Sequence, residues 1–246
     1  MAPIQTPRRS TDLTRRIRDL LRAEIIAEGF PNGVLPSEEA LRAEFAAPRA
    51  CVRDALMMLQ DEGLLTRVRG QGTFVSDGRV RQSLEETHGV TGFADDSIWR
   101  GRMTSAVLDW SDVPATPPVA RMLGIEVGTR VLRIDYTARL GAIAIGQATN
   151  HLTYPEAERL TPDMMRVDFY ALLREGGIEL GESTVMLDAG MADEHDAALL
   201  GVAVGEPLVL MEQCIYDPAG RPIDAAFVRC PATRSTFFSR SGRDPA

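Results

Sequence analysis

The sequence predicts an α+β protein of two parts, a small helical domain that ends in a β-hairpin and a larger domain built on an antiparallel sheet. Three observations predict this fold class. Apolar residues recur at helical spacing up to about residue 60, and a short hairpin pattern with a Gly-Gln-Gly turn follows over residues 65–75. Beyond residue 103, strand-like runs and turns alternate with short helical segments. The 246 residues suffice for two separate cores.

The first expected helix is defined by one apolar stripe. Its apolar positions fall at i, i+4, i+7, i+8 and i+12 and are Leu13, Ile17, Leu20, Leu21 and Ile25. The helix should therefore cover roughly four turns and pack the module together. Gly29, Pro31 and Gly33 are expected to end it.

Two shorter helices follow. Ser37 suits the N-cap of the second, and Leu41 and Phe45 would face the core. The third should start near Pro48 and end at Gly63. Its buried face would consist of Val52, Ala55, Leu56 and Leu59. A short helix, a tight turn and another helix are typical of a helix-turn-helix motif.

Two arginines make the third helix a candidate for reading DNA. Arg49 and Arg53 are four residues apart, so they share a face beside the buried stripe. An arginine can bind both acceptors of a guanine in the major groove, where a recognition helix places its N-terminal half. The alternative is an ordinary solvated face, because charged pairs at this spacing are common on helices.

The hairpin after the third helix favours the DNA-binding interpretation. Arg67 and Arg69 precede a turn formed by Gly70, Gln71 and Gly72. Because the two glycines have no side chain, this tip could approach a phosphate backbone or enter a minor groove closely.

Four motifs between Asp12 and Val75 carry a family resemblance. They are Leu35-Pro36-Ser37-Glu38, Val52-Arg53-Asp54-Ala55-Leu56, Glu62-Gly63-Leu64 and Gly70-Gln71-Gly72-Thr73-Phe74-Val75. This region resembles the GntR family of bacterial winged-helix repressors, which implies a winged helix-turn-helix DNA-binding domain over residues 1–76. The family's DNA contacts carry over to Arg49, Arg53 and Gly70. The full set of expected DNA-binding residues is Ser37, Glu39, Arg49, Arg53, Arg67, Arg69, Gly70, Gly72 and Thr73.

The chain departs from the family pattern at two positions. Glu39 stands where the family usually has an arginine that contacts DNA, and Pro48 stands where the recognition helix usually opens with serine. A carboxylate can accept from cytosine but repels phosphates, so the sequence predicts an operator that differs from the family's usual one.

The charge of the chain is distributed unevenly. Residues 1–80 contain 12 arginines and 11 acidic residues, and the remainder contains 15 arginines and 24 acidic residues. The acidic C-terminal part is therefore not expected to bind nucleic acid. The chain contains no lysine, which excludes a Schiff-base lysine for pyridoxal phosphate and the lysine of a phosphate-binding loop.

Neither a metal nor a cofactor is expected. Cys51, Cys214 and Cys230 show no paired spacing, and the three histidines lie far apart in the sequence. Cys51 should be a small buried side chain, with a redox switch as the alternative. No apolar run is long enough for a signal peptide or a membrane span, so we expect a cytoplasmic protein without membrane contact.

Residues 77–102 are expected to link the two domains, because glycines and polar residues interrupt any periodicity there. The second domain should cover residues 103–240. Its expected strands are 103–109, 129–140, 142–152, 184–189, 207–216 and 222–229. A turn and short helix are expected over 114–123, and helices over 169–175 and 194–200. These elements favour an antiparallel α+β domain.

Motifs in the second half carry a second resemblance. They are Val131-Leu132-Arg133, Asp168-Phe169-Tyr170-Ala171-Leu172-Leu173, Ala198-Leu199-Leu200-Gly201-Val202, Gly205-Glu206-Pro207-Leu208, Tyr216-Asp217 and Gly220-Arg221-Pro222-Ile223. This half resembles the UTRA effector domain of the HutC branch of the same family. The resemblance implies a chorismate-lyase-like antiparallel sheet with flanking helices, beside which a small metabolite binds and weakens operator binding.

The resemblance also implies effector-binding positions, and several are altered in this chain. The matching residues are Arg133, Asp135, Gln147, Asp168, Tyr170 and Asp224. Asp135 replaces the second arginine of an Arg-x-Arg pair, Gln147 replaces a glutamate, and Asp168 replaces a serine. If the set converges, Arg133 faces three carboxylates, which would repel a phosphate and favour a polyol or an amine. The alternative is an alignment slip of one or two residues, with solvated acids.

These observations predict a homodimeric repressor that is not an enzyme. A small effector that is not phosphorylated would modulate its affinity for a double-stranded DNA operator by favouring a domain arrangement that no longer fits the half-site spacing. Two other classes stay open. One is an enzyme of chorismate-lyase-like fold fused to a DNA-binding module, although no nucleophile and base stand out at recognisable spacing. The other is an architectural DNA-binding protein without a ligand.

Overall fold

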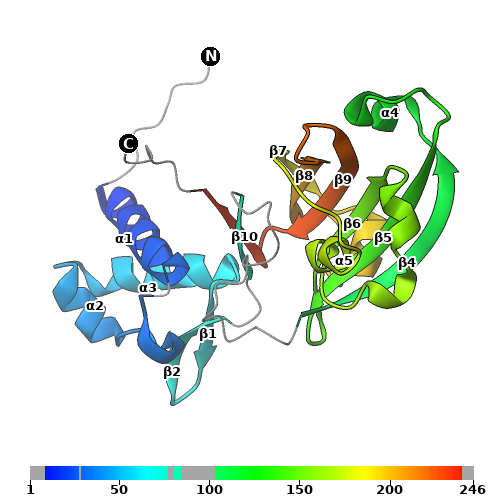
Figure 1. The fold of residues 1–246 in the computed structure, drawn as a ribbon. Coiled ribbons are helices and arrows are strands. Elements are labelled where there is room, and N and C mark those ends of the chain that lie inside the picture. Colours follow the sequence, from blue (N-terminus) through cyan, green and yellow to red (C-terminus); the bar gives the residue numbers. More distant parts are fainter. Residues whose placement is uncertain (1–8, 28, 77–79, 85–102, 240–246) are drawn as a thin grey trace, which may run out of the picture. The chain divides into compact units, whose positions relative to one another are not determined.

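The computed structural model describes residues 9–27, 29–76, 80–84 and 103–239. The chain divides into two compact units, Met1–Asp77 and Gly78–Ala246. Figure 1 shows the elements of both units along the chain. Each unit has its own hydrophobic core and is described by itself.

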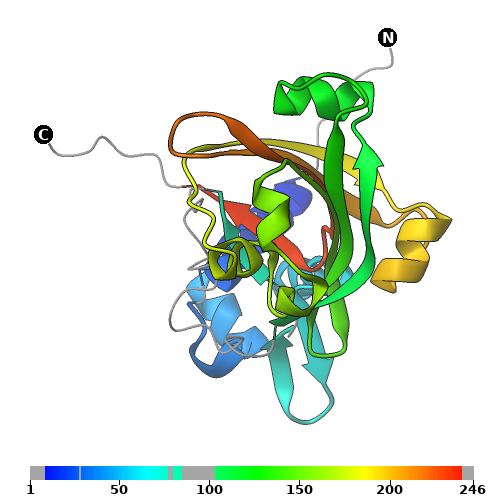
Figure 2. The ribbon, with the colours of Figure 1, turned by 45° about the vertical axis from the view of Figure 1, so that its right-hand side comes forward.

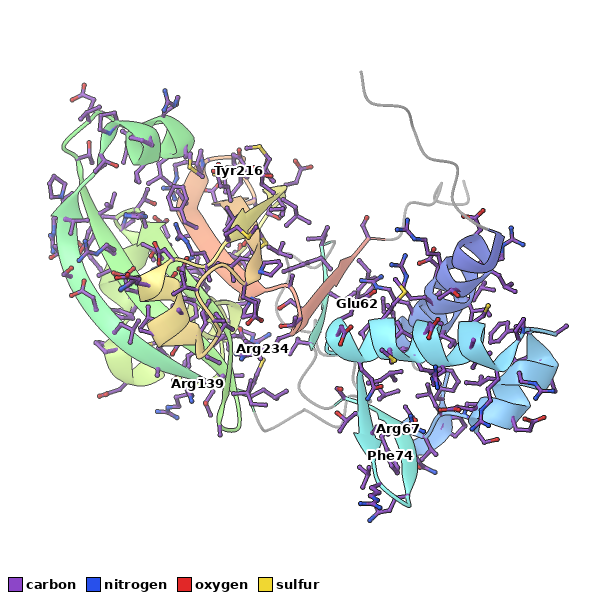
Figure 3. The ribbon with its side chains drawn as sticks, turned by 180° about the vertical axis from the view of Figure 1, so that it is seen from behind. Glu62, Arg67, Phe74, Arg139, Tyr216 and Arg234 are labelled. Carbon is purple, nitrogen blue, oxygen red and sulfur yellow. The ribbon has the colours of Figure 1, made fainter. Side chains whose placement is uncertain are left out.

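The N-terminal unit contains three helices and a hairpin. The elements are α1 (Arg9–Ile26), the 3-10 turn η1 (Pro31–Gly33), α2 (Glu38–Glu44), α3 (Arg49–Asp61), β1 (Leu65–Val68) and β2 (Gly72–Val75). The expected apolar stripes meet in one core, in which Ile17, Leu41 and Leu59 are almost fully buried. At the end of α3, Glu62 forms an ion pair with Arg22 of α1, with 3.3 Å between Nε and Oε2 (Figure 3).

Capping and turn chemistry set the boundaries of α2 and α3. The Ser37 side chain accepts a hydrogen bond from the Ala40 amide at 3.2 Å, which confirms the predicted N-cap. Pro48 is the N-cap of α3 and lies just outside the first helical turn. The segment before α2 is tied to the hairpin, because the Leu35 amide donates to the Thr73 carbonyl at 3.0 Å.

The C-terminal unit is built on a six-stranded antiparallel sheet of order β4-β5-β6-β9-β8-β7. The strands are β4 (Met103–Pro114), β5 (Arg130–Leu140), β6 (Ile143–Leu152), β7 (Ser183–Met191), β8 (Pro207–Tyr216) and β9 (Pro222–Pro231). The helices are α4 (Pro117–Leu123), α5 (Phe169–Glu175) and α6 (Glu194–Leu200), with 3-10 turns η2 (Glu156–Arg159) and η3 (Pro162–Met164). These elements form the predicted antiparallel α+β domain.

Helices cover the two faces of this curved sheet separately, as Figure 2 shows for α5 and α6. We call them the α5 face and the α6 face. On the α5 face, alternate residues of β5 such as Leu132 and Ile134 pack against Phe169 and Leu172. The α6 face carries two smaller apolar clusters, one of which packs Leu200 against Leu208 and Ala144. Because side chains alternate along a strand, the residues between those that face α5, such as Arg133 and Asp135 in β5, face α6.

A pair of short strands was not predicted. β3 (Val80–Ser83) lies inside the expected linker and pairs in parallel with β10 (Ser235–Phe238). Only Val80 in β3 is apolar, so the segment shows no alternating pattern, and its partner lies far along the chain. The segment 77–102, expected to link the two domains, thus contains a strand at residues 80–83 that was not predicted, and most of its remainder lies outside the described residues. In the part of the chain that the structure describes, no helix is long and apolar enough to cross a membrane.

Candidate nucleic-acid interface and ligand site

The exposed face of α3 carries the two arginines predicted to read DNA. Arg49 is the first residue of α3 and Arg53 lies one turn later, and both are exposed. Cys51 and Val52 between them are buried in the core of the unit, which fixes the orientation of the helix. The guanidinium groups therefore point away from the core, as a recognition helix requires. Contact with DNA by either residue stays a prediction.

The tip of the β1–β2 hairpin is open. Gly70 and Gly72 have φ angles of +78° and +129°, a region that disfavours other residues. A Cβ atom built on Gly70 would meet nothing within 4 Å, so the backbone conformation, not packing, requires glycine there. Arg69 is exposed beside this tip, and Arg67 lies opposite Thr73 in the β1–β2 register (Figure 3).

Glu38 organises this surface, and sequence reasoning missed its role. Its Oε1 atom lies 3.0 Å from Nη2 of Arg67, and its Oε2 atom lies 3.7 Å from Nε of Arg49. The Glu38 side chain is 19% exposed, whereas that of Arg49 is 76% exposed. One carboxylate at the start of α2 thus holds arginines of α3 and the hairpin near each other. The available sequence signal for Glu38 was its position in the Leu35-Pro36-Ser37-Glu38 motif.

The other residues predicted to contact DNA differ in whether their side chains are exposed and in whether they already bind a neighbour. Ser37 caps α2 and so uses its hydroxyl locally. Glu39 is 75% exposed and forms an ion pair with Arg42, with 3.3 Å between Oε2 and Nη1. Thr73 is half-buried in β2. Glu39 therefore remains able to approach a groove.

The six predicted effector residues do not converge, which corrects that expectation. Arg133, Asp135 and Gln147 lie on the α6 face, where Asp135 is paired across the strands with Thr149. Asp168 and Tyr170 lie at the start of α5, and Asp224 lies on the α5 face of β9, where Asn150 donates a hydrogen bond to it. The physical reason is the two-residue period of a strand, by which a shift of one residue moves a side chain to the other face.

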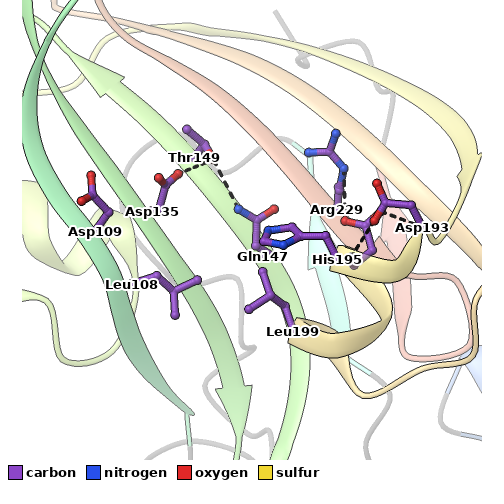
Figure 4. A pocket seen from close by; sticks show the side chains of 10 residues that line it. Leu108, Asp109, Asp135, Gln147, Thr149, Asp193, His195, Leu199 and Arg229 are labelled. Atoms are coloured by element: carbon purple, nitrogen blue, oxygen red, sulfur yellow. Dashed lines mark hydrogen bonds and ion pairs between the residues drawn. The ribbon is translucent and has the colours of Figure 1, made fainter.

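The α6 face contains a pocket of about 350 Å³ (Figure 4). Leu108, Asp109, Asp135, Gln147, Thr149, Asp193, His195, Asp196, Leu199 and Arg229 line it. Its polar side chains bind one another: Thr149 donates to Asp135 at 2.5 Å, Gln147 donates to Thr149 at 3.3 Å, and Arg229 Nε lies 3.4 Å from Asp196 Oδ1. Arg133 forms ion pairs with Asp109 at 2.9 Å and Asp135 at 3.3 Å. Most polar side chains of this pocket thus already have a partner within the pocket or beside it.

The α5 face contains a group of polar side chains that we call the buried polar cluster. It consists of Tyr136, Asn150, Asp168, Tyr170, Gln213 and Asp224. Asn150 Nδ2 donates to Asp224 Oδ2 at 2.7 Å, and Gln213 Nε2 donates to the Tyr170 hydroxyl at 2.7 Å. Asp168 is the N-cap of α5, because its Oδ1 atom accepts from the Ala171 amide at 2.8 Å. The carboxyl groups of Asp168 and Asp224 both act electrostatically on Tyr136 and Tyr170, so the members lie close together.

Three acceptor atoms of the buried polar cluster have no partner. They are Asn150 Oδ1, Asp168 Oδ2 and Asp224 Oδ1. The exposed fractions of these three residues are 2%, 8% and 0%. A buried polar atom without a hydrogen-bond partner costs free energy. Such atoms in a native protein therefore indicate that another molecule supplies the missing partner.

Burial shifts the acid–base behaviour of this cluster. It raises the pKa of Asp224 to about 8, and the hydrogen bonds from Asn150 and the His151 backbone offset this only in part. Burial also raises the pKa of Asp168, against the hydrogen bond from the Ala171 amide. The pKa of Tyr170 rises to about 12, again chiefly through burial. Asp224 therefore holds its proton at neutral pH.

Asn150 and Gln213 were not predicted as site residues. Each is a polar residue on the same strand face as apolar neighbours, such as Ala148 and Leu152 beside Asn150. That break in an apolar face was the available signal. Among the described residues, no group of three or more His, Cys, Asp or Glu side chains is arranged to hold a metal ion.

Comparison with known proteins finds two family models along the chain. Residues 13–75 match the model described as bacterial regulatory proteins, gntR family, and residues 100–236 match the UTRA domain. The chain is 28% identical to the transcriptional repressor NagR of Bacillus subtilis over 209 residues, which cover 84% of this chain and 85% of NagR. It is 28% identical to the histidine utilization repressor of Pseudomonas aeruginosa over 234 residues, 93% of this chain and 90% of that protein.

The repressor PhnF of Mycolicibacterium smegmatis is similar in sequence and in structure. It is 30% identical over 186 residues, which cover 74% of this chain and 73% of PhnF. The crystal structure described as PhnF from Mycobacterium smegmatis superimposes with a TM-score of 0.60 at 25% identity, covering 93% of this chain and all of the other. These relatives are regulators of transcription, which favours a regulator over the enzymatic alternative.

Proposed function

Because the chain belongs to the GntR family of bacterial regulatory proteins and carries a UTRA domain, we propose that this DNA-binding transcriptional regulator acts as a homodimeric repressor controlled by a metabolite at the buried polar cluster. The observation that carries the proposal is the set of three buried acceptors without partners on the α5 face. Two of these three acceptors belong to predicted effector residues, Asp168 and Asp224.

We assign sequence reading to α3 and backbone contact to the hairpin. Arg49 and Arg53 are exposed on the N-terminal half of α3, where they can bind guanine edges in the major groove. The open tip at Gly70 and the neighbouring Arg69 suit a minor groove or a phosphate. Glu38 is a positioning residue, since it touches both Arg49 and Arg67.

A second copy of the chain is part of the proposal. One helix-turn-helix reads a short half-site, so a specific operator calls for a pair. The sheet edge at β7 suits such a contact, because among the described strands β7 pairs only with β8. It also exposes Met186, Leu187 and Met191, the first and last by 63% and 70%. Apolar side chains and unpaired backbone groups on an edge strand favour pairing with another strand.

The effector is proposed to carry no phosphate. Asp168 and Asp224 present two carboxyl groups within the cluster, and among the described residues neither forms an ion pair with an arginine. Asp168 and the ionised form of Asp224 would repel a phosphate, which is negatively charged at neutral pH. Effector binding would shift the population toward a domain arrangement with lower operator affinity.

An operator-release assay tests this function. Binding sites selected from random DNA with the full chain supply the operator, and metabolites are then screened for release by fluorescence anisotropy. We expect a compound that releases the wild-type chain and acts more weakly on Asp168→Asn. Release that is unchanged in this variant would place the effector elsewhere, and turnover of the compound would favour the enzymatic alternative.

A further inference from the structure

We propose that the ligand of the buried polar cluster is a protonated amine, bound through its ammonium group by Asp168, Asp224 and Asn150. This inference rests on the proposed function, in which the cluster is the effector site. It deepens that function by naming the chemical class of the ligand.

Once Asp224 ionises, the three unpartnered atoms are all hydrogen-bond acceptors. Asn150 Oδ1, Asp168 Oδ2 and Asp224 Oδ1 are oxygen atoms of amide or carboxyl groups. The second polar atom of each side chain is already engaged, Asp224 Oδ2 with Asn150 Nδ2 at 2.7 Å and Asp168 Oδ1 with the Ala171 amide at 2.8 Å. An alkylammonium group offers three N–H donors, which equals the number of free acceptors.

The charge of the cluster favours a cation over a neutral hydroxyl compound. Asp224 itself is affected by burial and by hydrogen bonds from Asn150 and the His151 backbone. The titratable groups that it influences are Tyr136 from β5, Tyr170 of α5 and Cys214 from β8, and Asp168 and Cys230 of β9 also act on Tyr136. None of these side chains is cationic, although Arg174 acts electrostatically on Asp168. Hydroxyl groups would satisfy the acceptors but would supply no counter-charge for Asp168 or for the ionised form of Asp224.

Proton release should accompany binding of a cation. The empty cluster holds a proton on Asp224 at neutral pH, because burial raises the pKa of this group to about 8. An ammonium group stabilises the carboxylate form, so the proton passes to solvent as the cation binds. Below about pH 8, affinity should then rise by up to about tenfold per pH unit. A neutral ligand would not show this dependence.

The test uses the full chain and matched probes. Glucosamine, ethanolamine and putrescine serve as amines, glucose, ethylene glycol and butanediol as their neutral counterparts, and a hexose phosphate as the anion. Thermal shift identifies binding, since a ligand specific for the native state stabilises it. Calorimetry at pH about 6 and about 7 then measures affinity and proton release. Asp168→Asn and Asp224→Asn remove the cluster charges, and Asp109→Asn on the α6 face is the control.

We expect at least one amine to stabilise the wild-type chain and Asp109→Asn, with about tenfold tighter binding at the higher pH. Its neutral counterpart and the hexose phosphate should not bind, and the Asp168 and Asp224 variants should lose the effect. The inference is overturned if no amine stabilises the chain, if a neutral counterpart binds equally well, or if the phosphate binds most tightly. If a neutral or anionic compound binds the cluster and releases the operator, the proposed function still holds. Only the proposal that the ligand is an amine is then wrong.

Discussion

Asp224→Asn should change how the stability of the C-terminal unit depends on pH. Burial raises the pKa of Asp224 from 3.8 to about 8 in the native state. Between these values the native chain holds one more proton than the unfolded chain at this site. The free energy of unfolding therefore falls as pH rises from about 4 to about 8, by about 1.4 kcal/mol per pH unit. Asparagine cannot ionise, so the variant lacks this contribution.

Urea unfolding at pH about 5.5 and about 7.5 measures the effect, because the stability difference between wild type and variant should change by about 3 kcal/mol. Trp99 and Trp110, the two tryptophans of the chain, both belong to the C-terminal unit, so tryptophan fluorescence reports this unit alone. Asp109→Asn is the matched control. The pKa of Asp109 is lowered by hydrogen bonds from Ser111 and Arg133, so this carboxylate stays ionised at both pH values.

Parallel pH profiles for wild type and Asp224→Asn would refute this reasoning. They would mean that Asp224 loses its proton at the same pH in the native and unfolded chains. Burial would then not control its charge, and the proton release expected on ligand binding would have no source.

Three further predictions concern DNA and assembly. Arg49→Ala or Arg53→Ala should each cost about 1–3 kcal/mol on the selected operator and relax one position, whereas equal loss on every sequence would indicate phosphate contact alone. Glu39→Arg should shift selection from random DNA toward guanine at one base pair, and an unchanged preference would show that Glu39 does not read DNA. Met186→Arg on β7 should give monomers in sedimentation, while Val204→Arg, at a site 65% exposed outside β7, should not; a dimeric Met186 variant would exclude this edge.

Local patterns predicted the elements that depend on neighbouring residues. The stripes of α1 and α3 and the glycine turn of the hairpin appear in short stretches of sequence, and the structure confirms these elements. The pairing of β3 with β10 joins segments from opposite ends of the C-terminal unit. With one apolar residue in β3, no local signal marks that strand.

The ligand site shows a different limit. The resemblance placed Arg133 and Asp135 beside the effector, but both lie on the α6 face. The next residue, Tyr136, lies on the α5 face and belongs to the buried polar cluster. A shift of one residue in a strand exchanges the two faces of the sheet. The motif therefore identified the correct strand but not which of its residues face α5. Asp168, also named through the resemblance, does lie on the α5 face as the N-cap of α5, and its role in binding an effector stays a prediction.

Operator affinity measured with and without ligand, in wild type and Asp168→Asn, tests the central claim most directly. The claim is that a metabolite in the buried polar cluster controls DNA binding by α3. Fluorescence anisotropy on the selected operator should show that the stabilising amine weakens wild-type binding by about tenfold or more. The Asp168→Asn chain should bind the operator with the affinity of the wild type, and the amine should not change that affinity. Equal release of both chains, or no release of wild type by a ligand that stabilises it, would contradict the account.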